Sequence, residues 1–253
     1  MKLILKIIII LFFSQYSLGR ENGETEITTE DGIEVFQNEK FYLLKKNVII
    51  KSDNFNLSAE NVKINFDKNL YDITEMNAQG NVKFKSPEYK MSGSGETLNF
   101  EVKIEKLKIK GQNSELITED TKMYSDNTIE VNNLSGNFFL QGENSKLVNN
   151  SIVIKAESIE GIFSETNGKK EITFLNVVDK EKSYVKNNDT EMYAKKIKFN
   201  NETQIIELYE DVIIIRNGEN ITGDYGTLDT KNNSYKIKSN DQKKVKVIIQ
   251  NNE

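Results

Sequence analysis

One pair of motifs in the sequence has the spacing found in acyl-transfer enzymes. Ser183 and Lys186 match Ser-x-x-Lys, and Ser-Asp-Asn occurs at 52–54 and 125–127. In penicilloyl-serine enzymes these motifs are accompanied by Lys-Thr-Gly, and the serine stands on a helix. Here both Ser-Asp-Asn copies precede Ser183, no Lys-Thr-Gly follows, and no helical spacing surrounds the serine. We therefore attribute the match to a composition rich in Ser, Asn and Lys.

Other catalytic and metal-binding chemistry has equally little support. The chain contains no cysteine, histidine or tryptophan, which excludes thiol nucleophiles, Cys/His zinc sites and imidazole bases. Gly93-Ser-Gly95 lacks the third glycine and following helix of a dinucleotide loop. The acidic pairs Glu119–Asp120 and Asp224/Asp229 lack the spacing of a calcium loop. We predict that the protein is not an enzyme and holds no metal or cofactor.

Composition and charge limit which binding functions the protein can have. The chain has 253 residues, 37% of them hydrophobic, which is enough for a substantial core. Lys and Arg number 34 against 39 Asp and Glu, for a net charge of −5. Phosphate binding needs a basic surface, so nucleic acid is not an expected partner.

The first residues have the layout of a secretory signal peptide. Lys2 and Lys6 precede the apolar run 7–13, and Ser17 and Gly19 provide small residues for cleavage. We predict a signal peptide at 1–19 and export to the periplasm. Removing its two lysines changes the net charge from −5 to −7, so the mature chain is acidic.

From Ile33 to Ile249 the sequence alternates apolar and polar residues with a period of two. Segments such as 62–66, 82–84 and 245–249 are short, rich in β-branched and aromatic residues, and bounded by Asn, Asp, Gly or Ser. No stretch has sustained helical spacing. The pattern predicts an all-β protein.

A short motif recurs along this region. An apolar residue is followed by Ser or Thr, a small residue, four variable residues and a second apolar residue. Units of roughly 30–38 residues that cannot bury their own apolar faces are expected to stack into an elongated solenoid. Clear copies start at Leu57, Met91 and Ile221, and weaker copies at Met123, Ile154 and Met192.

Two further features accompany these copies. A valine stands nine residues before each clear copy, at Val48, Val82 and Val212, and Gly80-Asn81 and Glu210-Asp211 directly precede two of these valines. We expect the small third residue to permit a sharp turn or a close approach of two sheets. These small residues are Ala59, Gly93, Ala156, Ala194 and Gly223.

The segment 211–230, with its Ile-Thr-Gly-Asp sequence after a Val-Ile-Ile-Ile strand, resembles the signature unit of the LptA/OstA family. Segments 80–93 and 47–60 resemble the same unit. The resemblance spans a domain at 20–250, with clear repeats at 33–110 and 193–240 and a diverged middle at 111–177.

This resemblance implies a β-jelly-roll or β-taco fold, in which two facing antiparallel sheets enclose an apolar interior. It also implies a periplasmic lipopolysaccharide-transport protein that carries the acyl chains of lipid A in a groove. Expected partners are lipopolysaccharide, LptC-like and LptD-like transport proteins, and further copies of the chain joined head to tail. The candidate lumen residues are Val48, Ile50, Leu57, Ile64, Val82, Phe84, Met91, Leu98, Val212, Ile214, Ile221 and Leu228.

Two alternatives remain open from the sequence. If residues 3–13 stay in the membrane, the protein has a membrane-anchored, LptC-like role. If the interior is dry and closed, the chain is a structural or adhesive β-solenoid that binds protein. The lysines at 243, 244 and 246 either protect an exposed end strand or belong to a docking edge.

Overall fold

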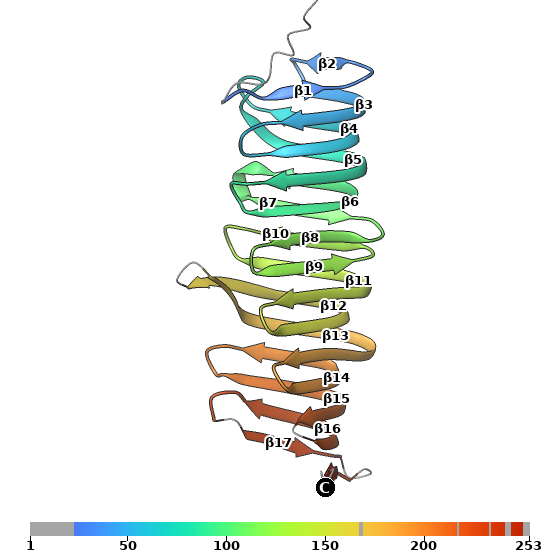
Figure 1. Ribbon diagram of the computed structural model, residues 1–253, viewed down its shortest axis with the longest axis vertical. Coiled ribbons are helices and arrows are strands. Elements are labelled where there is room, and N and C mark those ends of the chain that lie inside the picture. The colour runs from blue at the N-terminus through green and yellow to red at the C-terminus, as the bar shows by residue number, and fades with distance from the viewer. Residues whose placement is uncertain (1–22, 167–168, 217, 233, 241–243, 250–253) are drawn as a thin grey trace, which may run out of the picture.

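The computed structural model is an elongated stack of antiparallel strands, which begins with β1 and β2 and ends with β17 and β18 (Figure 1). It describes residues 23–166, 169–216, 218–232, 234–240 and 244–249. The predicted signal peptide at 1–19 lies outside these residues. Within them, no helix has the length and hydrophobicity that a membrane crossing requires, and the one helical element is the 3-10 turn η1 (Val102–Ile104).

The strands confirm the all-β prediction. They are β1 (Glu26–Thr28), β2 (Ile33–Phe36), β3 (Phe41–Lys51), β4 (Asn56–Phe66), β5 (Ile73–Ser86), β6 (Met91–Glu101), β7 (Lys106–Lys110), β8 (Ser114–Thr118), β9 (Thr121–Ser125), β10 (Thr128–Asn132), β11 (Asn137–Asn149), β12 (Ile152–Thr166), β13 (Lys169–Asn187), β14 (Thr190–Asn200), β15 (Ile205–Arg216), β16 (Glu219–Asp229), β17 (Ser234–Lys238) and β18 (Lys246–Ile249).

Each long strand contributes to two hydrogen-bonded ladders. In β6, for example, residues 91–94 pair with β8 and residues 97–101 pair with β7. Ladder A comprises β1, β8, β9, β18 and residues 48–51, 56–59, 82–86, 91–95, 145–149, 152–155, 183–187, 190–194, 212–216 and 219–223. Ladder B comprises β2, β7, β10, β17 and residues 41–45, 61–66, 73–79, 97–101, 137–141, 158–166, 169–178, 196–200, 205–209 and 225–229.

The resemblance to the LptA/OstA family implied two separate facing sheets. The ladders instead belong to one sheet. All the strands form one hydrogen-bonded network, in which β6, β7, β10, β11, β9 and β8 close a ring of pairings. The network is continuous because the long strands run through both ladders.

The strands pass from one ladder to the other at corners where the register shifts. In β3, β5 and β15 the corner is a pair of residues with positive φ: Lys46 and Asn47, Gly80 and Asn81, and Glu210 and Asp211. Left-handed backbone inserted into a strand acts as a bulge and bends it. The valine expected after each pair, at 48, 82 or 212, is the first buried residue beyond the corner.

A small residue lies opposite that valine on the next strand. Ala59 pairs with Val48 and Gly223 pairs with Val212. In the second copy, however, Gly95 pairs with Val82. The small residue of the second repeat copy, Gly93, pairs with Phe84.

The core runs continuously between the ladders. Alternate residues of both ladders point inward into a single cluster of buried aliphatic and aromatic side chains, including Leu44, Leu98, Leu140, Ile159 and Leu208. All the candidate lumen residues are buried except Met91, which is half-buried. The alternation places polar side chains on the outside of both ladders.

We expect Gly223→Val to destabilise the fold. A Cβ at Gly223 would lie 2.5 Å from Ile237 Cγ2 and 2.8 Å from the Lys238 carbonyl oxygen, so β17 would have to move. Overpacking of this kind should lower the free energy of unfolding by about 2 kcal/mol, as measured by urea denaturation. Thr222→Val, on the outward face of the same strand, is the matched control and should change stability little. An equal loss of unfolding free energy in both variants would show that the close contact between Gly223 and β17 does not explain the effect.

Candidate functional site

On the side of the molecule opposite the corners, turns between strands border the core. Strand-connecting turns of ladder A, such as 87–90 and 119–120, approach those of ladder B, such as 102–105 and 133–136. We call the line along which the two sets of turns meet the seam. It is the one boundary of the core that no strand crosses in the described part of the chain.

An apolar hollow of about 280 Å³ opens at the seam between β12–β13 and β14–β16. Ile152 and Val185 of ladder A form one wall, and residues of ladder B form the other. Neutral polar side chains, Asn187, Gln204 and Thr230, also line it. The ladder B wall consists of Ile172, Leu175, Ile197, Phe199 and Ile206.

Two other hollows lie along the seam and differ in character. One, of about 630 Å³, is lined largely by polar and charged residues, among them Lys90, Glu119, Asp120 and Glu165. The other is apolar but holds only about 40 Å³, because aromatic side chains of both ladders fill it. There the rings of Tyr89 (ladder A turn) and Phe100 (ladder B) meet edge to face at 6.5 Å.

Asn149 links the ladders beside the apolar hollow. Its buried Nδ2 donates hydrogen bonds to Thr121 Oγ1 in ladder A at 2.9 Å and to the Lys170 carbonyl oxygen in ladder B at 3.3 Å. A buried amide with satisfied donors holds its neighbours in a defined position. The seam is therefore tied at Asn149, whereas the hollow beyond it is bordered by apolar side chains.

The sequence-predicted lumen residues lie in or against the core, but none of them lines the apolar hollow. Only Phe84 and Met91 line a seam hollow, the small one. Val48, Val82 and Val212 lie at the corners, on the opposite side of the core. The residues of the apolar hollow were missed because most belong to weak repeat copies, although alternation at 152–154 and 205–208 was visible in the sequence.

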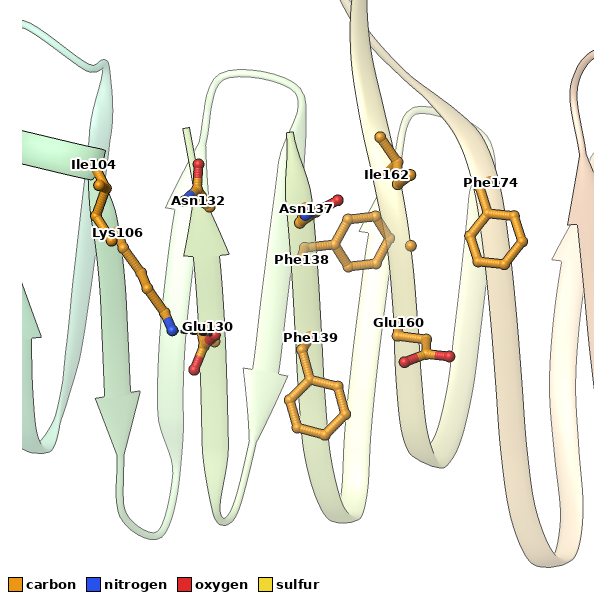
Figure 2. Close-up of a pocket in the computed structure, with 11 residues that line it drawn as sticks. Ile104, Lys106, Glu130, Asn132, Asn137, Phe138, Phe139, Glu160, Ile162 and Phe174 are labelled. Carbon is orange, nitrogen blue, oxygen red and sulfur yellow. Dashed lines mark ion pairs between the residues drawn. The ribbon is translucent and has the colours of Figure 1, made fainter. Parts of the chain in front are cut away.

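A separate hollow of about 580 Å³ lies on the outer face of ladder B (Figure 2). Phe139, Ile162 and Phe174 line it together with Lys106 and Glu130. Along their strands these side chains alternate with the buried Leu107 and Phe138 and the half-buried Val131, so they point away from the core. Asn132 lines both this hollow and the polar hollow at the seam.

Glu130 carries the main electrostatic interaction of this outer hollow. Its carboxylate lies 2.8 Å from Lys106 Nζ and 3.1 Å from Lys108 Nζ. Desolvation raises the pKa of Glu130, but the hydrogen bonds from the two ammonium groups outweigh it, so the pKa lies below its usual range. The hydrogen bond that Lys106 donates to Glu130 in turn raises the pKa of Lys106.

The structure separates the residues of the catalytic-looking motif. Ser183 points into the core, with Oγ 3.3 Å from the Lys195 carbonyl oxygen. Lys186, three residues along the strand, points outward and pairs with Glu191 at 3.1 Å. Residues i and i+3 of a strand lie on opposite faces, so Ser183 and Lys186 cannot act on one substrate. Glu119 is paired with Lys90, and no carboxylate cluster suited to a metal occurs in the described residues.

Glu130→Gln should destabilise the protein in a pH-dependent manner. A carboxyl whose pKa is lowered by folding stabilises the native state above its unfolded pKa, and this contribution disappears as the pH falls through the folded value. We expect a loss of about 1 kcal/mol at neutral pH, because the pair is partly exposed, and a much smaller difference near about pH 3. Urea denaturation at both pH values measures this.

Glu160→Gln is the control for that variant. It removes the same charge from the same outer face, where Glu160 accepts a hydrogen bond from Asn176 and has no lysine partner in the described chain. A pH-independent loss for Glu130→Gln, or an equal loss for Glu160→Gln, would show that the two ammonium contacts do not stabilise the fold.

Comparison with known proteins identifies the relatives of this chain. The family model described as LptA/(LptD N-terminal domain) LPS transport protein matches residues 29–137 and 122–234, which together cover most of the chain, including the middle region. No curated protein sequence matches it. Among solved structures, it is similar to the crystal structure of LptH, the LptA-homologous periplasmic component of the lipopolysaccharide transport device of Pseudomonas aeruginosa. The identity is 11%, with 90% of this chain and 96% of that chain covered and a TM-score of 0.23.

Proposed function

Because the chain belongs to the family of LptA and LptD N-terminal-domain lipopolysaccharide transport proteins, we propose that it carries the acyl chains of lipopolysaccharide between ladders A and B in the periplasm. In this proposal the ladders are the facing walls of a groove, the corners are its closed side and the seam is its mouth. The predicted signal peptide at 1–19 delivers the chain to the periplasm.

The observation that carries the proposal is the apolar hollow at the seam. It reaches from the surface to Leu175 and Ile197, which belong to the continuous core of the molecule. An acyl chain entering there passes neutral polar side chains first and buried aliphatic side chains next. Each methylene group transferred from water to such a site contributes about 0.8 kcal/mol.

Charge supports a carrier that recognises the lipid by its tails. The mature chain is acidic, with a predicted net charge of −7, so its overall field does not attract anionic head groups from a distance. The hollow has no acidic side chain in its lining, which removes a local source of repulsion. Affinity then comes from the buried tails, and the head group remains in solvent outside the seam.

The close packing of the core implies that loading requires movement. The 280 Å³ hollow is small beside a lipid with several acyl chains, and the side chains below it are fully buried. The ladders must therefore separate along the seam as the lipid enters, with the corners as the hinge. Among the described residues that border the hollow, none forms a hydrogen bond across the seam like that of Asn149, so we place the entry beside β12–β16.

We also propose that the two ends of the stack join the chain to neighbouring transport proteins. β1 and β2 pair only with β3, and β17 and β18 pair only with β16, among the described strands. Exposed apolar side chains such as Ile33, Val35, Val247 and Ile249 accompany these edges. Strand addition at the edges would join LptC-like and LptD-like partners, or further copies of the chain, into one continuous groove.

A photo-crosslinking residue at Phe199 tests the groove. Phe199 lines the apolar hollow, so p-benzoylphenylalanine at this position should crosslink to lipopolysaccharide in living cells and add its mass in denaturing mass spectrometry. The same residue at Lys198 points to the outside of the same strand and should give no adduct. Equal adducts at both positions, or none at either while native mass spectrometry finds no bound lipid, would favour the dry structural solenoid.

The mature N-terminus tests the localisation. If residues 1–19 are a signal peptide, the protein recovered from the periplasm should begin at Arg20, as measured by intact mass. Recovery of the chain in the membrane fraction with Met1 retained would instead support the membrane-anchored, LptC-like role.

A further inference from the structure

The outer face of ladder A carries a continuous row of side chains in which two lysines stand between tyrosines. Tyr124 on β9 pairs with Lys146 on β11, and Lys146 pairs with Lys155 on β12. Lys155 pairs with Tyr184 on β13, which pairs with Tyr193 on β14. Their strand neighbours, such as Leu147 and Ile154, are buried, so the row points away from the core. We call these five residues the Tyr–Lys row.

The side chains of the row contact one another along its length. Lys146 Nζ lies 5.8 Å from the centre of the Tyr124 ring, and Lys155 Nζ lies 5.7 Å from that of Tyr184. The Tyr184 and Tyr193 rings lie 5.0 Å apart. Neighbouring strands are about 4.8 Å apart, so the row extends over roughly 19 Å.

The two lysines at the centre have no acidic partner. They lie directly opposite each other, an arrangement that is unfavourable between like charges. Neither ammonium forms an ion pair with a carboxylate of the described chain, and Glu191, the acid beside Tyr193, is already held by Lys186. The pair therefore presents two uncompensated positive charges between tyrosine rings.

Basic residues predominate over the whole outer face of ladder A, although the chain as a whole is acidic. The acidic residues gather at the corners instead, for example Glu60, Glu96, Glu210 and Asp211. The outward acids of ladder A are Glu26, Glu115 and Glu191, and its outward lysines are Lys51, Lys83, Lys85, Lys122, Lys146, Lys155, Lys186 and Lys246.

From these features we infer that the Tyr–Lys row is a binding site for an acidic saccharide chain. The faces of tyrosine rings are electronegative and pack against the C–H groups of sugar rings. Lysine ammonium groups form charge-assisted hydrogen bonds with carboxylate or phosphate substituents. An extended row that holds a lysine pair flanked on both sides by tyrosine rings matches a linear polymer that carries both sugar rings and acidic groups. A simple polyanion needs no aromatic rings. The site lies outside the groove and does not depend on the proposed lipid carriage.

Tetragalacturonic acid is a suitable probe, with the uncharged maltotetraose for comparison. Titration calorimetry with the full-length protein should detect binding of tetragalacturonic acid that weakens as salt is added. Maltotetraose and inorganic phosphate should each bind much more weakly, because each satisfies one half of the row. Equal binding of inorganic phosphate would reduce the row to a simple anion site and overturn the inference.

Matched variants distinguish the row from the general charge of the face. The double variant Lys146→Gln/Lys155→Gln should weaken binding by about tenfold. Lys83→Gln/Lys85→Gln removes the same charge from the same face, away from the tyrosines, and should change affinity less than about twofold. Tyr184→Val, which leaves the charge unchanged and suits a strand, should also weaken binding. Equal losses in the two lysine variants, or none for Tyr184→Val in protein with the wild-type urea midpoint, would overturn the inference.

A lipid surface is the competing occupant. Vesicles of phosphatidylcholine with phosphatidylglycerol should not compete with tetragalacturonic acid for the row. If they do, and if Lys146→Gln/Lys155→Gln abolishes vesicle binding as well, the row binds anionic surfaces in general and the assignment to a saccharide is wrong.

Discussion

The corner within each long strand is the feature on which the rest of this structure depends. A strand that continued straight would belong to one sheet with two solvent-exposed faces, and its inward residues would have nothing to pack against. The left-handed pairs at Lys46–Asn47, Gly80–Asn81 and Glu210–Asp211 bend the chain so that one strand lines both sides of the core. Small residues opposite the following valines, such as Ala59 and Gly223, let the next strand pass close by.

This construction makes the two long sides of the core unequal. At the corners the covalent chain itself joins ladder A to ladder B, so those sides cannot separate. At the seam the ladders meet only through side chains and turns, for example at Asn149 and between Tyr89 and Phe100. In the proposed function the molecule opens at the seam, where the apolar hollow by Ile152 and Phe199 lies. The same asymmetry would let a lipid enter without the loss of backbone hydrogen bonds.

Strand register orders the polar side chains on the exterior as well as the apolar side chains of the core. Pairing in register places residues of the same orientation side by side across many strands, which turns single outward residues into rows. On ladder B such a row brings Lys106, Lys108 and Glu130 into an ion-pair network. On ladder A it brings Lys146 and Lys155 together without an acid. The chain therefore has a basic surface on ladder A although its net charge is −5.

The sequence alone determined the all-β class, the buried character of most predicted lumen residues and the family, because period-two alternation and the turn pairs before Val82 and Val212 are local patterns. The strand register was left to the tertiary structure, because only the pairing of β5 with β6 decides that Gly95 and not Gly93 lies opposite Val82. The seam hollow, the Asn149 tie and the Tyr–Lys row were decided by the tertiary structure. Their residues come from strands distant in sequence, and only pairing across the ladders and packing between them bring those side chains together.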